Sequence, residues 1–220
     1  MNLLSIRNLK KSYLNPEGER VAVVDVADFS MAAGMHAALQ GGSGCGKTTF
    51  LNMIAGILAP DSGEIVLDGE TITGMSEAKR DRLRARQVGY IFQTFNLLQG
   101  FSALENVELG MAFAGKVRRK HAKQLLETVG LADRMGHLPS QLSVGQQQRV
   151  AVARALANSP KLILADEPTG NLDPVRAREA MALIRSVCKD QGAALLVVSH
   201  DPAMISDFDQ IHDLTSINSA

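Results

Sequence analysis

Short apolar runs alternate with helical patterns in the C-terminal part of the chain. "KLILAD" and "AALLVVSH" are typical of buried strands, and apolar residues at helical spacing predict helices over 144–158 and 174–189, followed by a short helix and strand. Strands that alternate with helices favour a parallel sheet with both faces covered. We therefore expect an α/β core built around a parallel sheet.

The N-terminal and middle segments have different patterns. Strand-like runs such as "LLSIRNL" and "VAVVDVADF", separated by turn residues, predict an antiparallel β layer before the core. From 76 to 136, charged and apolar residues recur at helical intervals and predict helices near 77–84, 103–112 and 118–129, interrupted by "QVGYIFQTFNLL". This segment is therefore expected to form a mostly helical insert.

The composition is that of a globular chain without a strong overall charge. Its 220 residues, 45% of them hydrophobic, are enough to bury a sizeable core. Lys and Arg number 23 and Asp and Glu also 23, so no global field would draw the chain to nucleic acid. The start lacks signal-peptide features and no apolar run approaches the roughly 18 residues that span a bilayer, so we expect a cytoplasmic protein. Cys45 and Cys188 lack metal-type spacing.

The glycine-rich segment "LQGGSGCGKTTFLNMIAG" carries the clearest chemical motif. It fits G-x-x-x-x-G-K-[ST], between a strand-like run and a helix predicted over 47–57. In such a loop, backbone N–H groups surround a phosphate chain, Lys47 neutralises the outer phosphates and the Thr48 hydroxyl can bind Mg²⁺. We interpret it as a nucleoside triphosphate site, with a flexible glycine-rich turn as the alternative. The predicted nucleotide-binding residues are Gly41, Gly42, Ser43, Gly44, Cys45, Gly46, Lys47, Thr48 and Thr49.

Two acidic residues end the apolar run "LILADE". Asp166 and Glu167 lie at the C-terminal end of the predicted strand, where α/β sheets place ligands. We expect Asp166 to hold the Mg²⁺ shell and Glu167 to polarise the attacking water as a general base. A helix cap or a solvated turn is the alternative.

A third motif, "QLSVGQQQRVAVARAL", begins a predicted helix upstream of Asp166. It resembles the LSGGQ signature of ABC ATPases, which in that family faces the nucleotide of a second subunit. Ser143, Gly145 and Gln146 would contact the γ-phosphate there, because a serine hydroxyl and free N–H groups at a helix N-terminus can bind it. An ordinary N-cap is the alternative.

Four further residues match motifs of the same family. Gln93 in "YIFQTFNLL" resembles the Q-loop glutamine, which implies contact with Mg²⁺ and the attacking water. Asp173 in "GNLD" resembles the D-loop residue at the dimer interface, and His200 in "VVSHD" resembles the switch histidine that bonds the γ-phosphate. Tyr13 in "KKSY" resembles the aromatic residue that stacks on adenine, although it could equally be a half-buried Tyr at a strand end.

The resemblance covers the whole chain and is closest to the lipoprotein-release, macrolide-efflux and cell-division ATPases, the LolD/MacB/FtsE-type group. It implies a P-loop NTPase fold in a single ABC ATPase domain over 1–220. A RecA-like core and antiparallel β layer would comprise about 1–75 and 160–220, and a helical signature subdomain about 76–158.

Three positions depart from the family pattern. Val144 replaces the usual Gly, Thr48 replaces the commoner Ser, and Cys45 stands where Ser is frequent. We expect retained function. Cys45 is either a small residue that fits the loop or a thiol with a lowered pKa that would make the ATPase sensitive to oxidation.

The resemblance also implies cofactors and partners. Two copies would meet head to tail around two molecules of ATP with Mg²⁺, and hydrolysis would open this dimer and move separate, FtsX/MacB-like permease subunits at the inner face of the cell membrane. The helical insert with 95–98 is the expected docking surface, although these apolar residues could equally be insert core. The basic run at 116–123 is a solvated helix face or lies near anionic lipid.

Two other classes remain as alternatives. A soluble ABC ATPase acting on ribosomes or DNA usually has paired cassettes or a long coiled coil, whereas this chain has one cassette and no basic stripe. A P-loop kinase or GTPase is disfavoured by "LSVGQQQR" together with His200. The sequence does not indicate a cargo.

Overall fold

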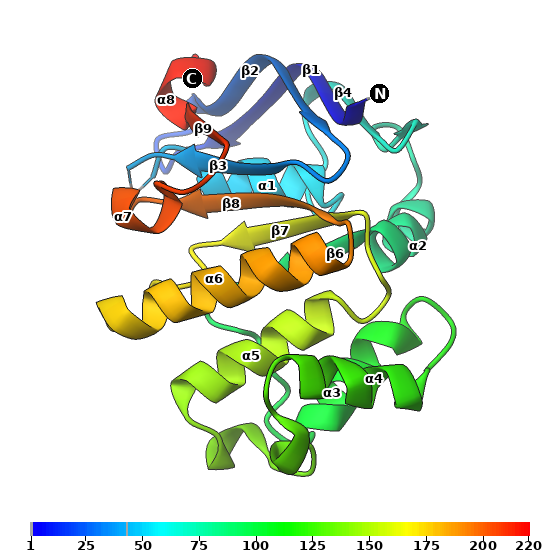
Figure 1. The fold of residues 1–220 in the computed structure, drawn as a ribbon. Coiled ribbons are helices and arrows are strands. Elements are labelled where there is room, and N and C mark those ends of the chain that lie inside the picture. The colour runs from blue at the N-terminus through cyan, green and yellow to red at the C-terminus, as the bar shows by residue number, and fades with distance from the viewer. Residues whose placement is uncertain (1, 43) are drawn as a thin grey trace.

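The computed structural model describes residues 2–42 and 44–220, which form two sheets and a helical part (Figure 1). The strands are β1 Asn2–Leu14, β2 Arg20–Ala32, β3 His36–Gln40, β4 Ser62–Leu67, β5 Glu70–Thr71, β6 Val88–Ile91, β7 Leu162–Asp166, β8 Ala194–Ser199 and β9 Gln210–Asp213. The helices are α1 Lys47–Ile54, α2 Glu77–Gln87, α3 Ala103–Ala112, α4 Arg119–Thr128, α5 Val144–Ala155, α6 Pro174–Asp190, α7 Pro202–Ile205 and α8 Leu214–Ile217, with 3-10 turns at Ala132–Arg134 and Pro139–Gln141.

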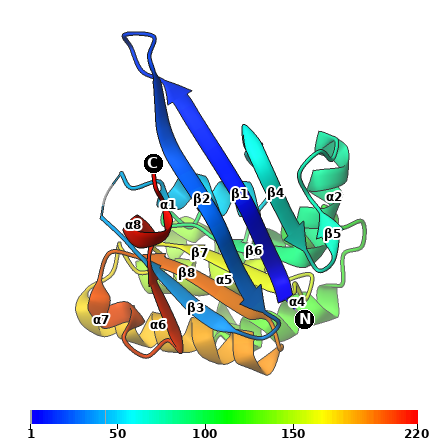
Figure 2. The same ribbon diagram turned by 90° about the horizontal axis from the view of Figure 1, so that it is seen from above.

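The first sheet is antiparallel and has the strand order β2-β1-β4-β5. The ends of β1 and β2 extend beyond it as a hairpin that projects from the molecule (Figure 2). Leu4 and Ile6, two residues apart on β1, are buried while Arg7 is exposed, as the period of a strand requires. This sheet is the predicted antiparallel β layer.

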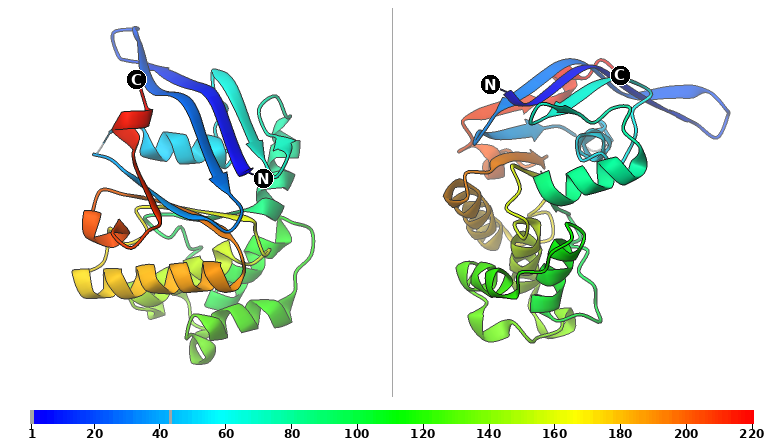
Figure 3. Two further views of the ribbon diagram at one scale, coloured as in Figure 1. Left: turned by 45° about the horizontal axis from the view of Figure 1, so that its top comes forward. Right: turned by 90° about the vertical axis from the view of Figure 1, so that its right-hand side faces the viewer.

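The core sheet is parallel, with the strand order β6-β7-β8-β3-β9. Every residue of β7 and β8 is buried, because both faces of the sheet are covered. Leu162 and Leu164 of β7 face α1 and the antiparallel sheet, whereas Ile163 and Ala165 face the helices on the other side. Figures 1 and 3 show the resulting layers: the antiparallel sheet, α1, the core sheet, α6, and then α3 to α5.

The predicted α/β fold with a parallel core sheet is confirmed, with one correction. The strand β6 lies inside the segment 76–158 that the sequence assigns to the helical subdomain, but it pairs with β7 at the edge of the core sheet. Its short run "VGYI" carried too few residues to be separated from the helical pattern around it. Among the described residues, no helix is both long enough and apolar enough to cross a bilayer.

Candidate active site

The glycine-rich loop joins β3 to the N-terminus of α1. Gly46, the N-cap of α1, has φ +90°, and a Cβ at this position would lie 2.5 Å from the Val23 carbonyl oxygen. Only glycine fits this left-handed, crowded position without strain. No side chain of the described residues caps α1, so the N–H groups of its first turn remain available to an anion.

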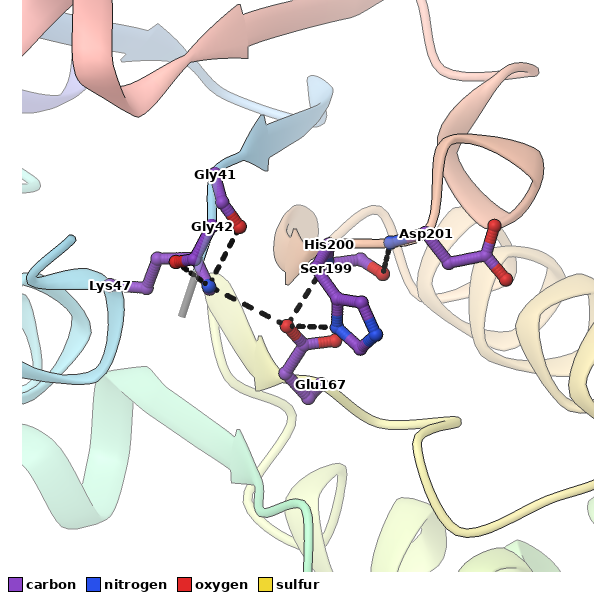
Figure 4. A network of polar contacts seen from close by, with 7 residues as sticks. All are labelled: Gly41, Gly42, Lys47, Glu167, Ser199, His200 and Asp201. Atoms are coloured by element: carbon purple, nitrogen blue, oxygen red, sulfur yellow. Dashed lines mark hydrogen bonds and ion pairs between the residues drawn. The ribbon is translucent and has the colours of Figure 1, made fainter. Parts of the chain in front are cut away.

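Lys47 is held under the loop in a fixed position. It is only 8% exposed, and its Nζ donates hydrogen bonds to the carbonyl oxygens of Gly41 at 2.8 Å and Gly42 at 2.7 Å. The same Nζ lies 3.8 Å from Oε1 of Glu167 (Figure 4). A buried ammonium group needs such partners, and here they fix a positive charge beside the loop.

Glu167 connects the loop to the end of β8. Its Oε1 accepts a hydrogen bond from the backbone N–H of His200 at 3.1 Å and lies 2.8 Å from Nδ1 of the same histidine (Figure 4). Glu167 also has φ +44°, an unfavourable conformation for a residue with a side chain that costs on the order of 1–3 kcal/mol. The surrounding contacts hold its carboxylate in a defined place although its backbone is strained, and such strain is common at functional sites.

Asp166 precedes Glu167 and is buried. Burial raises the pKa of Asp166 and the charge of Glu167 raises it further, whereas the Thr48 hydroxyl and the Lys47 ammonium lower it. A cation placed beside this buried carboxylate would stabilise its charged form.

These groups line one cavity of about 550 Å³. Its walls include the following residues predicted from the sequence: Gly42, Gly44, Gly46, Lys47, Thr48, Thr49, Gln93, Asp166, Glu167 and His200. Val23 also lines it and was missed, because a Val in a strand pattern gives no chemical signal. Gly41 lies next to the cavity as an acceptor for Lys47. Ser43 lies outside the described residues.

Two residues that the sequence predicted to bind the nucleotide, Tyr13 and Cys45, do not line this cavity. Tyr13 is 44% exposed on β1, near the projecting hairpin, with Nζ of Lys11 5.7 Å from its ring centroid. Cys45 is partly buried, and its backbone oxygen accepts a hydrogen bond of 3.3 Å from the Asn218 amide. The Asn218 amide also donates to the Val23 carbonyl oxygen at 3.0 Å. The C-terminal segment therefore links β2 to the glycine-rich loop and helps to hold the loop in place. Nothing in the sequence around Asn218 indicated this role.

The signature residues lie at a second cavity. Ser143 caps α5 by accepting from the N–H of Gln146 at 3.3 Å, and the Gln146 side chain accepts from the N–H of Ser143 at 3.0 Å. Both residues, together with Gly145, line a separate cavity of about 320 Å³. Val144 is exposed at the start of α5, so the replacement of the family's Gly leaves the capping box intact. Asp173 caps α6 through the N–H groups of its first turn.

Three side chains that the sequence analysis did not single out join these regions. Gln148 of α5 donates to the Pro168 carbonyl oxygen at 2.6 Å, just after Glu167. Asn171 donates to the Gln93 carbonyl oxygen at 2.7 Å. Arg154 of α5 donates to the carbonyl oxygens of both Phe95 and Asn96. The segment after Gln93 is therefore tied to the signature helix.

A third cavity, of about 460 Å³, lies between α2, β6 and the helical part. Its lining includes the apolar residues Phe92, Leu109 and Phe113, and also Arg154. The expectation that 95–98 forms a docking surface is wrong for Phe95 and Leu97, which are buried in the helical core. The neighbouring groove, by contrast, has exposed apolar residues such as Phe113 in its lining.

A strand, a glycine-rich loop and a helix that enclose a buried lysine, opposite two carboxylates at a parallel strand end, define a P-loop nucleotide site. Comparison with known proteins gives the family: the model of the ABC transporter family matches residues 24–170. The lipoprotein-releasing system ATP-binding protein LolD 2 of Caulobacter vibrioides is 41% identical over 95% of this chain and 92% of its own. LolD of Syntrophus aciditrophicus is 41% identical over 92% of each chain.

Solved structures agree with this assignment. The dimeric structure of the ABC transporter cassette MJ0796 aligns with a TM-score of 0.85 at 35% identity, over 94% of this chain and 92% of the other. A dimeric post-hydrolysis state of MJ0796 bound to ADP and Pi aligns with a TM-score of 0.82 at 36% identity, over 91% and 89%. The chain belongs to the ABC transporter family and is an ATP-binding subunit with ATPase activity. This excludes the P-loop kinase and GTPase alternatives.

Proposed function

We propose that this chain is a LolD-type ATPase subunit, which dimerises head to tail around two Mg-ATP and drives a separate membrane permease. The dimer proposal rests on the separation of the phosphate loop from the signature residues, which line two different cavities. Lys47 and Glu167 line one cavity, whereas Ser143 lines another, so a chain does not bring its own signature to its own phosphate loop. A second copy would supply the missing half, in keeping with the dimeric structures of the related cassette.

The residues of the cavity fit Mg²⁺ by the chemistry of their oxygen atoms. The Thr48 hydroxyl, the Asp166 carboxylate and the Gln93 side-chain amide all line it. The described residues include no cluster of three or more His, Cys, Asp or Glu that could hold a metal. Mg²⁺ does not need such a cluster, because it is usually bound by one or two carboxylates together with substrate phosphates. When bound, the ion would supply positive charge to the phosphates.

The remaining chemistry follows from the positions of Lys47, Glu167 and His200. Lys47 and the N–H groups of α1 bind the outer phosphates. Glu167 accepts the proton of the attacking water at its carboxylate, a contribution of roughly 10²- to 10⁴-fold. His200 orients that carboxylate through the 2.8 Å contact, and its exposed ring can reach the γ-phosphate. Tyr13 would stack on adenine from the hairpin side.

The permease would dock in the groove of about 460 Å³ between α2, β6 and the helical part. Arg154 lies at this groove and also holds the backbone of Phe95 and Asn96, close to Gln93. A segment seated in the groove would therefore act on the position of Gln93. This gives a physical route from the permease to the ATP site.

Capture from native membranes tests this proposal. Tagged Glu167→Gln protein, loaded with ATP in its own host, should co-purify after gentle solubilisation with a permease that has few spans and a large extracytoplasmic domain. Leu109→Asp, which places a charge in the groove, should lose that partner while still binding ATP. A many-span permease would contradict the LolD-type assignment. Recovery of ribosomes or DNA in its place would overturn the transporter assignment in favour of a soluble ABC ATPase.

A further inference from the structure

The turn between α3 and α4 exposes a large aromatic side chain. Phe113, at the C-terminus of α3, is 73% exposed, and Val117 in the same turn is 49% exposed. The turn is closed by hydrogen bonds from the N–H of Ala114 to the Met111 oxygen at 3.0 Å and from the N–H of Gly115 to the Ala112 oxygen at 2.9 Å. Two apolar side chains therefore lie at the tip of a hydrogen-bonded turn.

The base of the turn is anchored to the helical core. Met111 is fully buried, and its sulfur accepts a hydrogen bond from the N–H of Arg118 at 3.3 Å. The guanidinium of Arg118 donates to the Ala157 carbonyl oxygen at the end of α5 at 3.0 Å. Because both sides of the turn are held, the exposure of Phe113 is a fixed feature of the fold.

Positive charge is concentrated next to this side chain. The only acidic residue between 109 and 132 is Glu127, in a chain whose total charge is zero. The cations of that segment are Lys116, Arg118, Arg119, Lys120 and Lys123. Arg118 bonds a carbonyl oxygen and Arg119 pairs with Glu108 at 3.2 Å. The three lysines are exposed, and none lies within 4.0 Å of a carboxylate among the described residues.

One face of α4 packs against the helical core. Ala122, Leu125 and Leu126 are buried against the helical part, so the exposed lysines Lys120 and Lys123 face away from it. The turn lies on the same side of the molecule as α2 (Figure 1). Phe113 also borders the groove between α2, β6 and the helical part. Lys116 lies in the same turn as Phe113, and Lys120 lies in the first turn of α4, which follows it.

We infer that the segment 113–123 contacts an anionic membrane surface, with Phe113 in the boundary between headgroups and acyl chains and Lys116, Lys120 and Lys123 at the lipid phosphates. An aromatic side chain flanked by lysines suits this boundary, where each lysine gains from the negative surface potential. A protein partner is less well matched, because lysine is depleted in protein interfaces. This contact goes beyond the proposed function, since it requires neither ATP nor a permease.

Fluorescence of a single tryptophan tests the insertion. The chain has no Trp, so Phe113→Trp provides a unique probe. Leu14→Trp is a matched control, because Leu14 is 70% exposed on a hairpin whose charges, Glu17, Glu19 and Arg20, nearly balance. With protein-free vesicles of brominated phosphatidylglycerol and phosphatidylcholine, Phe113→Trp emission should shift to the blue and be quenched, and Leu14→Trp emission should not change. Neither variant should respond to vesicles of phosphatidylcholine alone.

Vesicle flotation tests the charges. Lys116→Gln with Lys120→Gln should lower the partition coefficient on phosphatidylglycerol vesicles about 25-fold, since each lysine near the surface contributes about fivefold. Arg7→Gln with Arg178→Gln removes the same charge from β1 and α6 and should change it less than about threefold. Unshifted Phe113→Trp emission, or equal losses in the two double variants, would overturn the inference. Neither result would bear on dimerisation or on capture of a permease.

Discussion

Replacement of Arg154 should displace the Gln93 segment and lower the rate of ATP hydrolysis, while nucleotide binding stays nearly unchanged. Arg154 donates to the carbonyl oxygens of Phe95 and Asn96, the latter at 2.6 Å. Those two residues have φ values of +58° and +49°. For Phe95 this left-handed conformation costs roughly 1–2 kcal/mol, whereas Asn adopts it more readily. The two hydrogen bonds compensate for this cost, so their loss should let the segment relax and displace Gln93.

The magnitude follows from the two bonds. Hydrogen bonds to a charged donor contribute about 1.5–3 kcal/mol each, and water can replace part of this where the carbonyl oxygens are accessible. Arg154→Met should therefore lower the free energy of unfolding by roughly 2–4 kcal/mol. It should lower kcat roughly 10- to 100-fold, because small displacements of a positioned group have effects of that size. KM for ATP should change less than about threefold, because Lys47 and the loop are untouched.

Arg118→Met is the matched control. It removes one arginine bond to a carbonyl oxygen, that of Ala157, in the same helical part and far from Gln93 in sequence. It should cost roughly 1–2 kcal/mol of stability and leave kcat unchanged. Urea unfolding and steady-state ATPase assays measure both quantities. If Arg154→Met lost stability but kept the parent kcat, the proposed link between Arg154 and Gln93 would be wrong.

Three further results are expected. Gly46→Ala should reduce ATP affinity at least about tenfold in a titration, because its Cβ would meet the Val23 oxygen at 2.5 Å in a φ +90° conformation; unchanged affinity would contradict the loop geometry. Burial lowers the pKa of His36, so stability should fall as the pH drops below about 6.5, where the unfolded chain takes up the proton first, and in pH-dependent melting His36→Asn should flatten this slope. Burial raises the pKa of Cys188 to about 12, so mass spectrometry after thiol labelling of the native protein should find Cys45 modified and Cys188 intact. If Cys45→Ser lost ATPase activity to the reagent as fast as the parent, oxidation sensitivity at this position would be excluded.

The sequence predicted most of the phosphate site because its chemistry requires particular residue types at fixed spacing. The loop from Gly41 to Thr49 and the pair Asp166 and Glu167 could be recognised in this way. The contact between Glu167 and His200 could be expected only as a family feature, since 33 residues separate them and only the order of β7 and β8 in the sheet brings them together.

The supporting contacts could not be predicted, because they depend on backbone positions that no short motif encodes. Arg154 and Gln148 lie on the signature helix, but their acceptors are carbonyl oxygens of distant segments. The strand β6 was hidden for a related reason, since four residues between a basic helix and a loop show no distinct period. Phe95 and Leu97 were assigned to a surface that the packing instead covers.

The central claim is that each chain carries half of each ATP site, and the mass of Glu167→Gln in solution tests it most directly. With Mg-ATP, light scattering should give twice the mass found with ADP, and Ser143→Arg added to Glu167→Gln should prevent this doubling while leaving ATP binding intact. A Glu167→Gln protein that stays monomeric at saturating Mg-ATP, or that dimerises equally without nucleotide, would contradict the account.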